Sequence, residues 1–196
     1  IELDSNFAMA HYWLGTGYLA VAPPEEVRKA WELRSKVTEK ERLLIEALYA
    51  ASIEENPAKS AELHQQIIQK YPREQQAYIE LQTDYWYRLC DYDRARETGE
   101  RGIRNDPMDK NILVNQPYLL AFLNKRTEAL HAIDGFIQLA PAEFNPYDTK
   151  GDVYLALGEP DSALIWWDKS IAIGSWASCQ KAAYQLILRR DYSRAL

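Results

Sequence analysis

The sequence predicts an all-α protein, an alpha-alpha superhelix (a solenoid) of tandem antiparallel helix pairs. Alanine recurs at one fixed spacing, at Ala61, Ala95, Ala129 and Ala163. Val27 precedes Ala61 by the same interval. The period, about 34 residues, is the length of a helix–turn–helix unit that stacks on its neighbours. Apolar residues recur at three- and four-residue spacing, whereas no alternating run or βαβ order predicts a strand.

The recurring alanine has a physical reason in such an array. Two helix backbones approach closely at that position, and a larger side chain would overpack the contact between them. The expected helices are each too short to be stable alone, so stacking against neighbours must supply the stability.

Local signals place the first four helices. The first is expected from Phe7 to Ala22, and prolines 23 and 24 then break the chain and open a second helix over about 25–37. Thr38 and Glu41 have the spacing of a capping box, which predicts a third helix over about 38–53. Asn56 and the proline after it open a fourth helix that ends near residues 71–72.

The later helices follow the same period, because Pro107 and Pro141 close two successive pairs and are separated by the same interval as the alanines. Pro117 lies inside a predicted helix, where it should introduce a kink. The remaining helices are expected over about 75–89, 92–105, 109–123, 126–139, 146–157, 160–173 and 176–190, with another beginning at 192–196.

These elements predict one elongated domain over 1–196, with about five repeats plus partial terminal units. The repeats are expected at about 7–37, 38–72, 75–107, 109–141 and 144–175, with a partial one at 176–196. The chain opens in mid-repeat at Ile1, and we interpret it as a piece of a longer protein.

Composition argues against several classes of partner. A net charge of −6 and a pI near 5.2 argue against nucleic acid, which needs clustered lysine and arginine, and against an anionic membrane surface. No run of about eighteen apolar residues predicts a membrane span. Cys90 and Cys179 are too few for a disulfide framework; as buried or half-buried free thiols they favour a reducing, cytoplasmic location.

The repeats resemble the tetratricopeptide repeat (TPR). That family's pattern places an aromatic residue, Leu-Gly and Tyr on the first helix of a pair, and Ala, an aromatic residue, Ala and Pro on the second. The best copies here are Leu14, Gly15 and Tyr18 with Trp31, and Tyr147, Gly151, Tyr154, Gly158, Ala163 and Trp167. Departures that affect local geometry are Gln116 with Pro117 in place of Leu-Gly, Gly99 in place of the aromatic residue, and Ser175 in place of proline.

Two stretches carry a narrower resemblance. Residues 32–49 and 145–154 look like repeat regions fused to bacterial serine/threonine kinases, adenylate cyclases or winged-helix regulators. This resemblance implies a sensor or docking portion of a signalling protein, with an effector domain upstream of Ile1.

The family resemblance also implies a binding face, because the first helix of each TPR pair lines a concave groove. The residues at those inward positions are Tyr12, Thr16, Tyr49, Thr83, Trp86, Asn115, Tyr118, Asp148 and Asp152. Aromatic and amide side chains suit an extended peptide or a partner helix. The alternative is that the aromatic rings pack against neighbouring helices. A carboxylate clamp of the chaperone-binding kind is not expected, since Tyr12, Thr16, Ile79 and Thr83 occupy comparable places.

Catalytic, metal and cofactor sites are not predicted. Asp148 and Asp152 lie one turn apart and could form a carboxylate pair or a cation site, but a favourable interaction with the helix dipole is the simpler interpretation. His11, His64 and His131 lack ligand spacing, and no nucleophile has a base beside it. Trp167 is expected in the contact between helices, with Trp166 turned to another face.

Three functional hypotheses remain. The leading one is a non-catalytic scaffold that binds a protein or peptide in the groove. The second is self-association, for example as a homodimer, or regulation of an effector domain in the parent protein. The third is an independently active enzyme.

Overall fold

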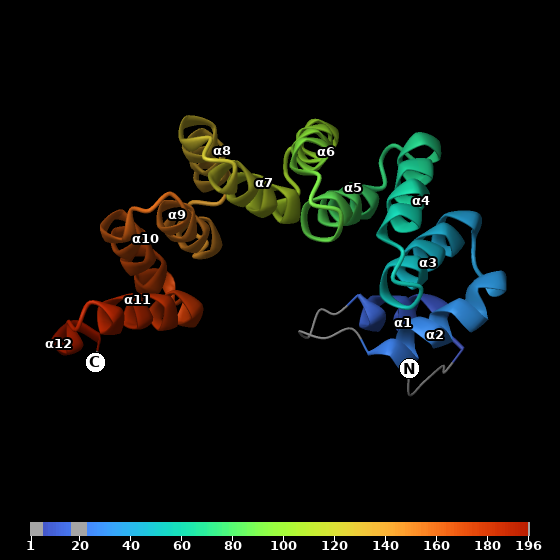
Figure 1. Cartoon of the computed structure of the whole chain (residues 1–196), viewed down its shortest axis with the longest axis horizontal. Helices are drawn as coiled ribbons and strands as arrows, with labels where there is room; N and C mark the ends of the chain where they lie inside the picture. The colour runs from blue at the N-terminus through green and yellow to red at the C-terminus, as the bar shows by residue number, and fades with distance from the viewer. Residues whose placement is uncertain (1–5, 17–22, 196) are drawn as a thin grey trace. The chain divides into compact units, whose positions relative to one another are not determined.

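A computed structural model describes residues 6–16 and 23–195, and every regular element within these ranges is a helix (Figure 1). The residues form two compact units, Ile1–Asp106 and Pro107–Leu196. The boundary between the units falls between two of the expected repeats, so each unit is built from whole helix pairs.

Over residues 6–16 and 23–106, the first unit contains three consecutive helix pairs. Thr38 and Glu41 form the expected capping box at the start of α3, and the side chain of Asn56 caps α4 by accepting from the Lys59 backbone N–H at 3.0 Å. The elements are α1 (Ala8–Gly15), α2 (Pro24–Leu33), the 3-10 helix η1 (Arg34–Lys36), α3 (Glu39–Ser52), α4 (Pro57–Lys70), α5 (Gln75–Thr83), the π-helix η2 (Asp84–Arg88) and α6 (Tyr92–Asn105).

The second unit, described over residues 107–195, also contains three pairs. Pro117 lies buried inside α7, and Asp109 and Ser175 cap α7 and α11 with their side chains. The elements are α7 (Lys110–Phe122), α8 (Arg126–Leu139), α9 (Asn145–Ala156), α10 (Pro160–Ile173), α11 (Trp176–Leu188) and α12 (Tyr192–Ala195).

Helices within each unit pack mainly on their sequence neighbours. Each odd-numbered helix packs on the one that follows it, and the second helix of one pair packs on the first helix of the next. First helices of successive pairs also meet, α1 with α3 and α7 with α9. This is the nearest-neighbour packing that the repeat predicts.

The periodic small residues lie where that packing requires them. Val27, Ala95, Ala129 and Ala163 are fully buried, and Ala61 is 4% exposed. Ala129 packs with Leu120 and Val153, which brings α7, α8 and α9 together. The prediction that these residues occupy helix–helix contacts is confirmed.

In the pairs α5–α6, α7–α8 and α9–α10, the turn uses a residue with left-handed backbone conformation. Cys90, Asn124 and Gly158 have φ of 53°, 56° and 78°, and each is separated from the next by one repeat period. The turn is closed by a hydrogen bond from the next residue's N–H, such as Lys125 N to the Leu120 carbonyl at 2.8 Å. This arrangement is the Schellman motif, which glycine accommodates without a steric penalty.

The helix boundaries follow the predictions closely, and 92–105, 126–139 and 160–173 agree residue for residue. Two expectations need correction. The helix expected over 75–89 is α-helical only to Thr83 and continues as a π-helix, whose extra residue per turn shifts the side chains that follow. Cys90 is exposed rather than buried, because it lies in a turn.

The first helix is described as α1 only to Gly15, with Thr16 as its C-cap. Tyr18 and the rest of the expected helix over 17–22 lie outside the described residues.

Trp167 lies in a helix–helix contact, as predicted. Its ring is 1% exposed and packs where α9 carries Gly151, while Trp166 is half-buried on another face of α10. A Cβ on Gly151 would lie 2.4 Å from two atoms of the Trp167 ring. The tryptophan therefore fits against α9 only because residue 151 has no side chain.

Candidate functional site

In the first unit, the predicted groove residue Tyr49 forms part of a stacked column. Its ring stacks on Trp31 with centroids 4.1 Å apart and planes at 19°. The Arg34 guanidinium carbon lies 3.8 Å from the centroid of Trp31. Tyr49 is half-buried, so its ring is held in place by α2 while part of it stays accessible.

Two other predicted groove residues of this unit are buried. Tyr12 is 1% exposed and Trp86 is 9% exposed. Burial, with smaller effects from the charges of Glu80 and Glu74, raises the pKa of Tyr12 well above its usual range. Both side chains are thus enclosed by protein, and the Trp86 ring stacks on Tyr87 with centroids 4.5 Å apart.

The two predicted threonines of the first unit bond to their own backbone. The Thr16 hydroxyl donates to the Trp13 carbonyl at 2.8 Å, and the Thr83 hydroxyl donates to the Ile79 carbonyl at 3.0 Å. Both residues are half-buried. Tyr49 is therefore the aromatic candidate of this unit with an accessible surface.

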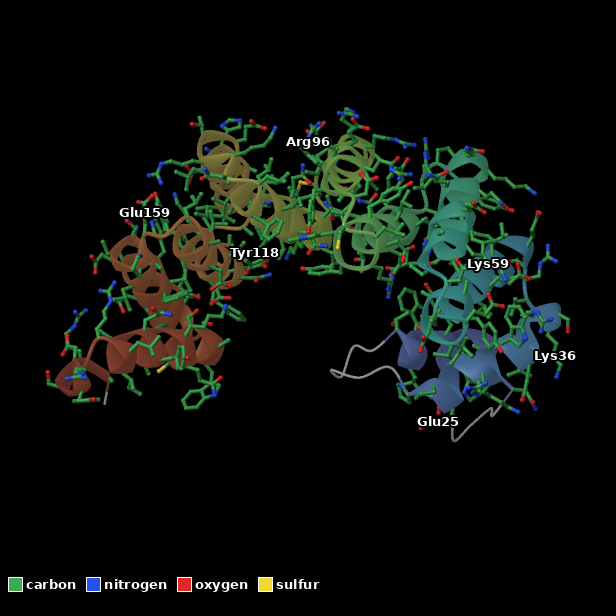
Figure 2. The ribbon with its side chains drawn as sticks, viewed as in Figure 1. Glu25, Lys36, Lys59, Arg96, Tyr118 and Glu159 are labelled. Atoms are coloured by element: carbon green, nitrogen blue, oxygen red, sulfur yellow. The ribbon has the colours of Figure 1, made fainter. Side chains whose placement is uncertain are left out.

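In the second unit, two predicted residues meet across α7 and α9, namely Tyr118, which Figure 2 labels, and Asp152. The Tyr118 hydroxyl donates to Asp152 Oδ2 at 2.6 Å, and the indole Nε1 of Trp167 donates to Asp152 Oδ1 at 3.0 Å. Asp148 lies one turn before Asp152 on α9, and half-buried Asn115 lies one turn before Tyr118 on α7. The repeat explains the meeting of Tyr118 and Asp152, since they are separated by one repeat period and occupy equivalent positions.

Sequence reasoning missed the residue that joins the two carboxylates. Lys181 Nζ on α11 lies 2.7 Å from Asp148 Oδ2 and 2.6 Å from Asp152 Oδ2. The Ser178 hydroxyl donates to Asp148 Oδ1 at 2.6 Å. We call Tyr118, Asp148, Asp152, Ser178 and Lys181 the polar network. The repeat could have predicted this contact, because Lys181 follows Asp148 by close to one repeat period and so occupies nearly the equivalent position in the next repeat.

Electrostatics explain why the network holds together. Burial lowers the pKa of Lys181, but hydrogen bonds and charge from Asp148 and Asp152 outweigh it, so the pKa is raised and the ammonium stays charged. Burial and the Asp152 charge raise the pKa of Tyr118, which keeps its hydroxyl a donor. The ammonium of Lys181 forms an ion pair with both carboxylates. Asp148 also lies in the first turn of α9, where the helix dipole favours it.

A second polar cluster centres on Asp84, which is completely buried at the start of η2. Ser60 Oγ donates to Asp84 Oδ2 at 2.8 Å, and His64 Nδ1 lies 2.9 Å from the same oxygen. Arg88 Nη1 donates to Oδ1 at 2.5 Å. A serine nucleophile would need its hydroxyl on the imidazole. Here the hydroxyl donates to the carboxylate, so the cluster links α4 to η2 and does not form a nucleophile–base pair.

In residues 6–16 and 23–195, no three histidine, cysteine, aspartate or glutamate side chains group so as to hold a metal ion. Within the same ranges, none of the helices combines the length and the apolar character needed to cross a bilayer.

Comparison of the fold with solved structures finds TPR proteins. TTC0263, a thermophilic TPR protein of Thermus thermophilus, is 18% identical, with a TM-score of 0.64 over 96% of this chain and 98% of that one. MamA from Desulfovibrio magneticus RS-1 is 13% identical, with a TM-score of 0.61 over 81% of this chain and 90% of that one. Another MamA structure is 16% identical, with a TM-score of 0.60 over 85% and 91%.

Comparison of the sequence itself gives no match to a family model or to a curated protein. At the identities found, the similar structures establish the fold, which is that of a TPR solenoid. The resemblance to TPR proteins is thus confirmed for the fold. The narrower resemblance to bacterial signalling proteins stays a prediction.

Proposed function

We propose that this chain is a non-catalytic scaffold that binds a peptide or partner helix, as the sensor or docking part of a larger signalling protein. The polar network carries the proposal, because it joins the first helices of three successive pairs, α7, α9 and α11. In TPR proteins the first helices line the binding face, and the network places Tyr118, Asp148 and Asp152 on them.

The network is suited to recognition because its side chains are fixed before a ligand arrives. Asp148 and Asp152 are 13% and 19% exposed in their side chains, and Lys181 is 35% exposed. Each carboxylate oxygen can accept more than one hydrogen bond, so both can take further N–H donors from a peptide. Fixed side chains lower the entropy lost on binding.

The experiment selects binding peptides from a random library against the 196-residue chain and measures their affinity by fluorescence anisotropy. The double variant Tyr118→Phe/Asp148→Asn preserves shape but removes a donor and a charge. We expect it to weaken binding at least about tenfold, a loss of about 1.4 kcal/mol. Far-ultraviolet circular dichroism should not change.

The matched control is Tyr184→Phe/Asp168→Asn, two exposed positions of the same unit outside the network. We expect its affinity to equal that of the unmodified chain. Peptides that bind the network variant and the unmodified chain equally would rule out the network as the binding surface. Failure to select any peptide would argue against the scaffold function.

Self-association, or control of an effector domain in the parent protein, is the second candidate. An apolar face on α11 favours self-association, since Trp176, Tyr184 and Leu188 are 73%, 60% and 60% exposed. Large exposed apolar faces mark interaction sites. Light scattering over a concentration series tests it: a mass that rises with concentration and falls back in Tyr184→Glu supports it, and a constant monomer mass contradicts it.

A further inference from the structure

The first unit contains an open cavity of about 630 Å³ beside α3. It lies between one face of α3 and the segment that precedes that helix. Glu39, Arg42 and Glu46 share the α3 face, because they are spaced at i, i+3 and i+7. The lining residues are Arg34, Ser35, Val37, Glu39, Arg42 and Glu46.

Arg34 is held rigidly at the wall of this cavity. Its guanidinium lies flat over Trp31, 3.8 Å from the ring centroid, and its Nη1 donates to the Trp31 carbonyl at 2.7 Å. Trp31 is itself fixed by stacking on Tyr49. A guanidinium has five N–H donors in a planar fork, and within the part of the chain that the structure describes Arg34 has no other hydrogen bond and no ion pair.

Arg42 supplies a second guanidinium. It is exposed, and among residues 6–16 and 23–195 it forms no ion pair, although Glu39 and Glu46 lie about one turn away on either side. Its guanidinium is therefore accessible to a ligand, although its charge also acts on the neighbouring Glu39.

The nearer carboxylates do not neutralise this pair of arginines. Glu39 Oε2 is bound by Lys70 Nζ at 2.5 Å and accepts from the Tyr71 hydroxyl at 3.2 Å. The hydrogen bond and charge of Lys70 are the main causes that lower the pKa of Glu39, and the charge of Arg42 adds a smaller effect. With Glu39 compensated by Lys70, two guanidinium groups face one remaining carboxylate, Glu46. The cavity therefore carries a positive charge in an acidic protein.

We propose that this cavity binds an oxyanion, a carboxylate or phosphate group, carried by the partner. Arg34 and Arg42 donate to the oxyanion, and the Ser35 hydroxyl provides a further donor. Arginine suits this role because its fork matches the geometry of both groups. Glu46 accepts an N–H of the same ligand, which favours a peptide over a free polyanion. Only one part of this inference rests on the proposed function, namely that the oxyanion belongs to a bound partner.

The test titrates the 196-residue chain at constant ionic strength and records the arginine side-chain signals by nuclear magnetic resonance. One arm uses inorganic phosphate, and the other uses N-acetyl-glutamate amide, which has a single carboxylate. We expect saturable shifts of Arg34 and Arg42. Arg34→Gln and Arg42→Gln should each raise the dissociation constant at least about fivefold. Arg28→Gln, an exposed position on α2 outside the cavity, should change it less than about twofold.

Saturable binding of either probe, or of both, supports the site and shows whether it binds phosphate, carboxylate or both. Shifts that stay linear for both probes, or equal dissociation constants in Arg42→Gln and the unmodified chain, would overturn it. Arg42 is exposed, so its variant tests the site without disturbing the core. The small probes do not depend on the polar network of the second unit, so failure here is distinguishable from failure of peptide binding there.

Discussion

A single methyl group at Gly151 should destabilise the second unit. In Gly151→Ala the new Cβ would lie 2.4 Å from Cδ1 and from Nε1 of Trp167. The indole is 1% exposed and cannot move into solvent without opening the contact between α9 and α10. Any displacement also weakens its 3.0 Å hydrogen bond to Asp152, which belongs to the polar network.

The magnitude follows from three effects. Overpacking costs about 1–3 kcal/mol, and a weakened hydrogen bond to a carboxylate costs about 1.5–3 kcal/mol. The higher helix propensity of alanine returns about 1 kcal/mol. The free energy of unfolding should therefore fall by about 1.5–5 kcal/mol.

The matched control is Gly135→Ala on α8. It is also a glycine inside a helix, but no atom outside its own helical neighbourhood lies within 4 Å of its added Cβ. Without overpacking, alanine should stabilise the chain by about 0.5–1 kcal/mol. The same substitution is thus predicted to have opposite signs at the two positions.

Urea unfolding followed by circular dichroism measures both variants. In the background of Trp167→Leu, the loss caused by Gly151→Ala should shrink, because residues in contact are energetically coupled. A Gly151→Ala variant as stable as Gly135→Ala, or an undiminished loss in the Trp167→Leu background, would refute the proposed contact.

Three further predictions concern stability. Asp84→Ala should cost about 3–5 kcal/mol, because it leaves Ser60, His64 and Arg88 without their acceptor; Asp168→Ala, at an exposed site, should change the urea midpoint little. Hydrogen bonds from the Thr38 side chain and then its backbone lower the pKa of Glu41 below the ordinary 4.5. The unmodified chain should therefore be more stable than Glu41→Gln by a constant amount above pH 4.5, and this difference should disappear as the pH falls through the lowered pKa. A stability difference that does not change with pH would argue against this role. Ala129→Leu should cost about 1–3 kcal/mol by overpacking, whereas Ala156→Leu, at an exposed position, should leave the melting temperature nearly unchanged.

Much of the fold could be predicted from local signals. Prolines, capping residues and three- to four-residue apolar spacing act within a few residues, so the bounds of α6, α8 and α10 agree with the prediction. The conversion of the helix after Thr83 into a π-helix was not predictable in this way. The π-helix begins at Asp84, whose hydrogen bonds to Ser60 and His64 on α4 are tertiary contacts that local signals do not reveal.

The candidate site was predicted less completely. Tyr118, Asp148 and Asp152 were identified, and the structure brings them together. Lys181 and Ser178 were missed, because nothing in their own neighbourhood marks them as partners of Asp148. Tyr12 and Trp86 were assigned to the same face, but both are buried.

The sequence by itself determined the repeating helix pairs, because the regular spacing of small side chains and the local helix signals are properties of the linear chain. The tertiary structure decided which polar groups meet and which aromatic rings stay accessible. Those outcomes depend on how each helix is rotated about its axis when it packs. That rotation is fixed by contacts such as Gly151 with Trp167, between residues far apart in the repeat.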